Sequence, residues 1–326
     1  MMQRIVGQLP PWMHPEHPVL RYLLENRRSV DTARGRWTRA LFIILLGGML
    51  LLIGYINASN LFEQNPLDLP ISEMLFEMLF LPTFILQVGL QLTVLLVTMN
   101  AIGEEKRRQV WDSLRTTTDG AALALRTRWV AAVFYRMRGA MIILLLVRAI
   151  LIGGLLYDLT AFEGEYLKYL TGGIIPDTPL FLEVVLLAFT MTSSLLLPIT
   201  SLGVDAAVGL LISTFVQQRT YVVLSQILLV AIRVAFVGGL LFGVEQFRAG
   251  VLDSPNALLW VLLFVFAVMG DWGLSFLFMG FYGQQVWVYV PYSIFLGAAM
   301  LAFVIAQAIL IDLVLAWAIR RAELQE

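Results

Sequence analysis

Four charged side chains interrupt the apolar runs of this 326-residue chain: Arg148, Asp205, Arg233 and Asp312. Because a charge inside a membrane is costly, such residues pair with one another or serve a function. Arg148 and Arg233 stand near the middle of their runs, so we expect acidic partners for them, with Asp205 and Asp312 as candidates. Ion pairing between helices is the favoured interpretation, and a polar lining that contacts a substrate is the alternative.

A second polar feature, Gly270-Asp271-Trp272-Gly273, cuts the apolar run 258–281. Glycine permits a sharp change of backbone direction, and aspartate accepts hydrogen bonds from the first N–H groups of a helix. We therefore expect a hinge at Gly270, Asp271 and Gly273 between two half-helices. Asp271 is expected to cap one of them rather than to contact a substrate.

The sequence shows no recognisable catalytic constellation. The chain has no cysteine, and its two histidines, His14 and His17, stand in a proline-broken N-terminal stretch. The phosphate-binding pattern G-x-x-x-x-G-K-[ST] is absent, and neither Lys106 nor Lys168 follows a glycine. We expect no enzyme activity, no metal site and no cofactor. No basic tract with interleaved aromatic residues is present, so a nucleic-acid partner is not expected.

The composition is that of a membrane protein. Hydrophobic residues make up 59% of the chain and charged residues 14%, with a mean hydropathy of +0.82, whereas soluble domains carry about a quarter charged residues. Several apolar runs exceed the roughly 18 residues that span a bilayer as a helix. The sequence predicts an all-α polytopic membrane protein with a single transmembrane domain over 1–326. Six spans are expected, at 40–57, 79–101, 139–157, 180–216, 221–242 and 296–319.

Two details of these spans are also predicted. The amphipathic stretch ISEMLFEMLF, which precedes the second span, is expected to approach the membrane obliquely, and Pro82 to kink the span. The fourth apolar run, 180–216, is too long for one straight span. Pro198 and Gly203 are expected to break it into two helical pieces.

The distribution of basic residues predicts the topology. All but four of the 22 Lys and Arg residues fall in the N-terminal stretch, in 103–138, in the turn 217–220 and in the C-terminal tail. Since basic residues concentrate on the cytoplasmic side, we expect these four regions and both termini to be cytoplasmic. This requires an even number of crossings before the last span, so 244–295 is expected to hold a re-entrant pair that enters from the outer face. A full span at 258–281 is the alternative.

Residues 1–38 contain a short amphipathic stretch that begins at Pro18. Arg21 and Glu25 stand on its polar side, opposite an apolar stripe. This pattern is typical of a helix that lies in the membrane interface.

The segment 103–138 begins with "GEEKRRQVWDSLRTT" and is expected to start as a short cytoplasmic helix. It presents an apolar patch of Val110, Trp111 and Leu114 between charged faces. An exposed tryptophan beside arginines is common at protein interfaces. The patch predicts either a docking site for a soluble partner or a solvated loop whose tryptophan dips into the headgroups.

Taken together, these features resemble the permease subunit of type-2 ABC exporters. The stretch His17-Pro18-Val19-Leu20-Arg21, followed by Glu25, is similar to the interfacial elbow helix of that family. The frame of the family's coupling helix, which follows the second span, is matched by Ile102, Glu105, Val110, Trp111, Asp112, Leu114 and Thr117. The stretch AAVGLLISTF at 206–215, the six-span layout and the re-entrant region are also similar. Departures from the family pattern stand at Arg107, Gln109, Thr118 and 126–129.

The resemblance implies a fold and a mechanism. The fold has six transmembrane helices with an elbow helix, a coupling helix and a re-entrant pair before the last span. A separate nucleotide-binding ATPase subunit would dock on Arg21, Glu25, Glu105, Val110, Trp111, Asp112, Leu114 and Arg115. Two permease chains, identical or different, would then move a lipidic or amphipathic cargo across a bacterial cytoplasmic membrane. The departures favour an alternative, a non-catalytic structural subunit of a larger respiratory or photosynthetic membrane complex.

Overall fold

The computed structural model describes residues 10–25, 47–48, 52, 55, 71–103, 120–161, 180–216, 218–248, 257–278 and 292–324. All elements within these ranges are helices, and five of them are long and apolar enough to cross a membrane. The described part of the chain is therefore all-helical, and its five long helices have the length and composition of membrane spans. In hydrocarbon the backbone must satisfy its own hydrogen bonds, which a helix does within one segment.

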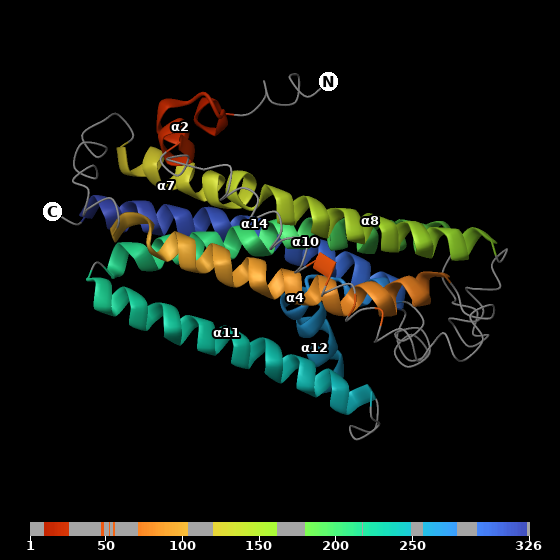
Figure 1. The fold of residues 1–326 in the computed structure, drawn as a ribbon. Helices are drawn as coiled ribbons and strands as arrows, with labels where there is room; N and C mark the ends of the chain where they lie inside the picture. Colours follow the sequence, from red (N-terminus) through yellow and green to blue (C-terminus); the bar gives the residue numbers. More distant parts are fainter. Residues whose placement is uncertain are drawn as a thin grey trace.

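The five long helices form an elongated bundle (Figure 1). They are α4 (Ile71–Met99), α8 (Arg138–Ala161), α10 (Leu180–Phe215), α11 (Arg219–Arg248) and α14 (Tyr292–Leu324). The second, third, fifth and sixth predicted spans overlap α4, α8, α11 and α14. Helix α10 covers the long fourth apolar run. The predicted first span lies almost wholly outside the described residues, as do 104–119.

The side-chain contacts show the directions of the helices. Gln91 of α4 bonds Asp205 of α10, and Thr98 approaches Gly209, so α4 and α10 run parallel. Helix α14 also runs parallel to α10, because Gly297 near its start lies against Leu186 and Trp317 near its end makes an edge-to-face contact with Phe215.

Helices α8 and α11 run in the opposite direction. Asp158 near the end of α8 accepts hydrogen bonds from the N–H groups of Ile71 (3.2 Å) and Ser72 (2.7 Å) at the start of α4. This carboxylate therefore caps α4 from the neighbouring helix. Helix α11 follows α10 along the chain and returns along α4, where Gln226 donates a hydrogen bond to the carbonyl oxygen of Leu96.

The segment between α11 and α14 enters the bundle and turns inside it. Helix α12 (Ala257–Val265) continues into the π-helical η3 (Phe266–Gly270), and the 3-10 helix η4 (Ser275–Leu277) follows the turn. Helix α11 ends at the side where α14 begins, since α11 runs opposite to α10 and α14 runs parallel to it. The re-entrant pair stays a prediction, because residues 249–256 and 279–291 lie outside the described residues.

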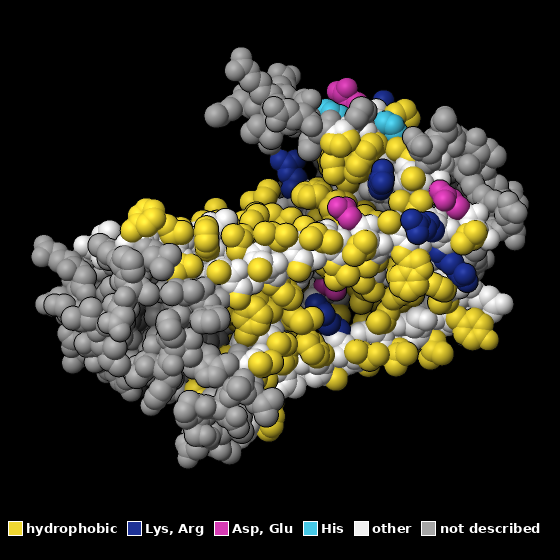
Figure 2. Space-filling model, turned by 180° about the vertical axis from the view of Figure 1, so that it is seen from behind, with side chains coloured by type: hydrophobic (Ala, Val, Ile, Leu, Met, Phe, Trp, Pro, Cys, Tyr) yellow, Lys and Arg dark blue, Asp and Glu magenta, His cyan; other side chains and the backbone are white. Residues whose placement is uncertain are grey.

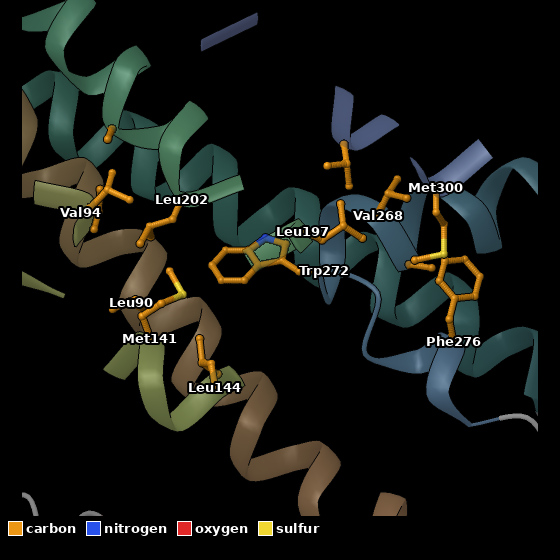
Figure 3. Packing of buried hydrophobic residues seen from close by; sticks show 14 residues of the cluster. Leu90, Val94, Met141, Leu144, Leu197, Leu202, Val268, Trp272, Phe276 and Met300 are labelled. Atoms are coloured by element: carbon orange, nitrogen blue, oxygen red, sulfur yellow. The ribbon is translucent and has the colours of Figure 1, made fainter. Parts of the chain in front are cut away.

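Trp272, at the apex of this segment, lies in the centre of the largest hydrophobic cluster (Figure 3). It is 1% exposed. The surrounding side chains come from four long helices and from η3, among them Leu90, Met141, Leu144, Leu197, Leu202, Val268 and Met300. The re-entrant apex is thus part of the core rather than an addition to its edge.

One expectation about the helices is wrong. Helix α10 is one continuous element of 36 residues, although Pro198 and Gly203 were expected to break it. The stretch ISEMLFEMLF belongs to the same helix as the predicted second span, because α4 starts at Ile71 and includes Pro82; its oblique approach to the membrane stays a prediction.

The second half of 103–138 belongs to the bundle. Helix α7 (Gly120–Val130) and the π-helical η2 (Ala131–Arg136) lead directly into α8. Ala121 and Leu125 of α7 are buried against α10 and α14. At the same end, the short helix α2 (Pro18–Glu25) packs on α7, with Leu20 fully buried.

Helix α11 differs from the other long helices in its exposure. It stands apart from the rest of the bundle in Figure 1, and only 11% of its most apolar 18-residue stretch is buried. Most of its surface therefore faces lipid or a partner within the membrane.

Candidate functional site

A group of buried polar contacts surrounds Arg148 of α8. Its guanidinium is fully buried. The Nη1 group donates to the carbonyl oxygens of Ser194 (2.6 Å) and Trp272 (2.8 Å), and Nη2 donates to the carbonyl oxygen of Asp271 (3.1 Å) and to Gln87 Oε1. One side chain thereby joins α4, α8, α10 and the re-entrant apex.

The bond from Arg148 to Ser194 explains why α10 continues through its proline. Pro198 has no N–H, so the carbonyl oxygen of Ser194, four residues earlier, loses its helical partner. Arg148 supplies the missing donor at 2.6 Å. A neighbouring helix thus satisfies the backbone group that the proline frees, which is how proline is accommodated within membrane helices.

Asp271 holds the re-entrant apex together. Its Oδ1 accepts the N–H groups of Gly273 (3.1 Å) and Leu274 (3.2 Å), and its Oδ2 accepts the N–H of Ser275 (2.8 Å). The carboxylate therefore caps the first turn of η4. Gln87 Nε2 adds a bond to the Asp271 carbonyl oxygen at 2.9 Å.

The apex has an unusual backbone. Trp272 has φ 55° and Gly273 has φ 79°, so two successive residues adopt left-handed conformations. This is disfavoured for a bulky residue such as tryptophan. The burial of Trp272 and the bonds from Arg148 hold the chain in this conformation.

A second polar group lies one helical turn away along α4. Gln91, four residues after Gln87, donates from Nε2 to Asp205 Oδ2 at 2.7 Å. The same oxygen lies 3.5 Å from Arg233 Nη2 of α11. Gln87 and Gln91 therefore place the Arg148 cluster and the Asp205–Arg233 ion pair one turn apart along α4.

The four intramembrane charges have different environments. Arg233 pairs with Asp205, one of the two acids suggested for it. Arg148 pairs with neither candidate acid but with carbonyl oxygens and Gln87, and the acid near it is Asp271. Asp312 is exposed on α14 and forms no ion pair with any of the described residues.

The two glutamines were missed by the sequence analysis. Gln87 and Gln91 lie four residues apart in an otherwise apolar run, so they share one face of a helix. Paired amides on one face of a predicted span were the available signal, because uncharged polar side chains also seek partners in a membrane.

The predicted docking residues are only partly described. Arg21 lies exposed on α2, and Glu25 ends this helix. Glu105, Val110, Trp111, Asp112, Leu114 and Arg115 lie outside the described residues.

The end of the bundle that carries α2 and α7 is basic. Charged side chains gather toward one end of the hydrophobic body in Figure 2. In α7, Arg128 is buried, and this burial, together with the nearby Arg136, lowers its pKa to about 9. Tyr135 donates from its hydroxyl to the carbonyl oxygen of Met13 (2.9 Å), which fastens the N-terminal stretch to η2.

The buried site can bind by hydrogen bonding and charge, but it lacks the groups of a metal centre. Among the described residues, no three His, Asp or Glu side chains lie close enough to hold a metal ion. Comparison with known proteins identified no matching family model, no matching curated protein and no matching solved structure.

Proposed function

We propose that the chain is the membrane-spanning permease subunit of an ABC-2 type exporter, which moves a lipidic or amphipathic cargo with ATP hydrolysed by a separate subunit. One arrangement carries the proposal. Helix α2 packs on α7 at the end where α4 stops and α7 starts. The candidate elbow helix and both ends of the segment 104–119 are therefore close together, as a common docking surface requires.

The topology follows from the same arrangement. The end with α2, α7 and the last turn of α14 carries most of the described arginines, so it faces the cytoplasm under the positive-inside rule. With a further span at 40–57, the chain has six spans and two cytoplasmic termini. The membrane is a bacterial cytoplasmic membrane, and two permease chains form the transport unit.

The docking residues have separate roles in this mechanism. Trp111 and Leu114 insert into a pocket of the ATPase, and Glu105, Asp112, Arg115 and the N-terminal Arg21 and Glu25 surround them with charge. Buried aromatic anchors with a polar rim are typical of protein interfaces. Closure of two ATPase subunits then moves α4 and α7 through the segment that joins them.

Substitution in the apolar patch tests this role. The double variant Trp111→Asp and Leu114→Asp, carried by a tagged chain, is expected to lose its soluble partner, since a carboxylate cannot enter an apolar pocket. Mass spectrometry of the material recovered with the tag measures the partner. The control Gln109→Asp adds a charge outside the patch and is expected to keep the partner. Retention by both variants would refute the docking role.

The exposure of α11 supports a second candidate, a structural subunit of a larger respiratory or photosynthetic membrane complex. A helix with 11% burial over its apolar stretch leaves a large surface for other membrane subunits. This alternative predicts a fixed ratio to foreign subunits and no dependence on ATP. Recovery of the chain as a dimer with a P-loop protein would contradict it.

A further inference from the structure

Arg233 has unused hydrogen-bonding capacity. A guanidinium carries five N–H donors. Among the described residues, the guanidinium of Arg233 approaches Asp205 Oδ2 with Nη2 at 3.5 Å, and its buried Nε has no hydrogen-bond partner. Such a long contact is weak compared with the usual charge-assisted distance of about 2.7–2.9 Å.

Asp205 does not depend on this contact. Gln91 Nε2 donates to the same Oδ2 atom at 2.7 Å, which is shorter than the approach of Arg233. When Arg233 moves away, Asp205 keeps a bonded partner on α4. Arg233 is therefore the member of the pair that gains from another anion.

Arg233 is also accessible, whereas Arg148 is not. The side chain of Arg233 is 22% exposed, and its neighbours Ile232 and Val234 are exposed apolar residues. Arg148, in contrast, is fully buried, and four acceptors surround it.

We propose that Arg233 binds the acid group of an anionic amphiphile, a molecule with an apolar chain and a carboxylate or phosphate. The acid group replaces the distant Asp205 oxygen, and the chain lies along the exposed apolar side chains of α11. Arginine suits this role because its planar fork bonds carboxylates and phosphates with two parallel hydrogen bonds. The ligand is the cargo if the proposed function holds, so the inference extends that function.

The hydrogen bonds of Arg233 and Asp205 indicate that the ligand is an anion. A cationic amphiphile would have to displace Arg233 from Asp205 and would leave the guanidinium without any acceptor. A neutral alcohol offers one oxygen without charge. An anion alone improves the bonding of Arg233 while Gln91 keeps Asp205 satisfied.

Native mass spectrometry of the full chain in neutral detergent tests this proposal. The probes share one apolar chain: oleate, oleoyl lysophosphatidate, oleyl alcohol and oleylamine. Inorganic phosphate tests the head alone, and phosphatidylglycerol tests a bulk membrane lipid. We expect one bound oleate or lysophosphatidate per chain, with affinity at least about tenfold above that of the alcohol and the amine. Equal binding of all four single-chain probes would overturn the proposal.

Two substitutions with opposite expected signs separate ligand binding from structural pairing. Arg233→Gln is expected to weaken oleate binding about tenfold or more, whereas Asp205→Asn is expected to strengthen it, because the competing acid is removed. A purely structural ion pair predicts the same loss for both variants. Arg219→Gln, at the exposed start of α11, is the control and should bind as the unchanged chain does. If Arg233→Gln fails to fold, Arg233→Lys is the substitute, because lysine keeps the charge. Arg233→Lys should bind oleate more weakly than the unchanged chain does, but more tightly than the unchanged chain binds oleyl alcohol.

The outcome is independent of the ATPase. Specific oleate binding without any recovered P-loop partner would support the anion site and contradict the exporter. A recovered P-loop partner with no preference for anionic probes would support the exporter and contradict the anion site.

Discussion

The side chain of Arg148 on α8 links its own helix to α4, α10 and the apex at Asp271 and Trp272. It contacts α4 through Gln87, α10 through the Ser194 carbonyl, and the apex through the carbonyls of Asp271 and Trp272. Hydrogen bonds to a charged group contribute about 1.5–3 kcal/mol each, and their loss would leave buried carbonyl oxygens unpaired. The residue is therefore central to the stability of the bundle.

Replacement of Arg148 by glutamine tests this role. We expect Arg148→Gln to lower the free energy of unfolding by on the order of 3 kcal/mol, because the shorter amide cannot reach all four acceptors. Thermal unfolding in detergent measures the change. Arg138→Gln, an exposed site on the same helix, should unfold like the unchanged chain. An unchanged midpoint for Arg148→Gln would contradict the proposed linkage.

The cap of η4 makes a second prediction at this scale. Asp271→Ala removes the acceptor of three N–H groups and is expected to destabilise the chain by about 0.5–2 kcal/mol. Asp271→Asn keeps one carbonyl oxygen and should lose less. Hydrogen exchange of the amides at 273–275 should rise in the alanine variant, and equal protection in both variants would argue against the cap.

Individual residues could be predicted only in part. The cost of a charge in a membrane singled out Arg148, Asp205 and Arg233, and the glycine spacing singled out Asp271. The partner of Arg148 could not be predicted, because it is mostly backbone carbonyl oxygen, which every residue carries. Only the fold shows that Pro198 leaves one of these oxygens free next to this arginine.

At the scale of elements, close helix packing depends on a few glycines. Gly209 of α10 faces Thr98 of α4 so closely that a Cβ atom would overlap the threonine side chain and approach the backbone of Leu95. Gly238, on the exposed side of α11, has nothing within 4 Å of a Cβ position. Small residues at helix contacts are how membrane helices approach one another.

These two glycines form a matched pair for mutagenesis. Gly209→Ala is expected to destabilise the bundle by about 1–3 kcal/mol, because α4 and α10 must move apart. Gly238→Ala should be neutral or stabilising by up to about 1 kcal/mol, since alanine favours helix. The unfolding midpoints of the two variants give the comparison, and equal effects would show that α4 and α10 do not pack as described.

The long helices were predictable, because a long apolar run with few charges has no other stable form in lipid. The ends of these helices were harder to predict from the sequence. Helix α4 begins at Ile71, where Asp158 of α8 caps it, and no local pattern at Ile71 announces this partner. Helix α7 has Arg126 and Arg128 among its 11 residues, yet it packs on α10 and α14.

For the whole molecule, the helix directions predict which sites share a side. Gln218 and Glu323 should lie on one side of the membrane and Glu245 on the other, because α11 runs opposite to α10 and α14. Since the chain has no cysteine, the single variants Gln218→Cys, Glu245→Cys and Glu323→Cys report their own accessibility. An impermeant maleimide on sealed vesicles should label the first and third together. Labelling of the second and third together would mean a full crossing at 258–281.

The central claim is that the chain works with a separate ATPase. The most direct measurement is gentle solubilisation of the unmodified chain from its native membrane, followed by mass spectrometry of the chains that remain bound. The account predicts a soluble chain with a P-loop in stoichiometric amount. Redox or pigment-binding subunits in a fixed ratio, without any P-loop protein, would contradict it and would make the chain a structural subunit.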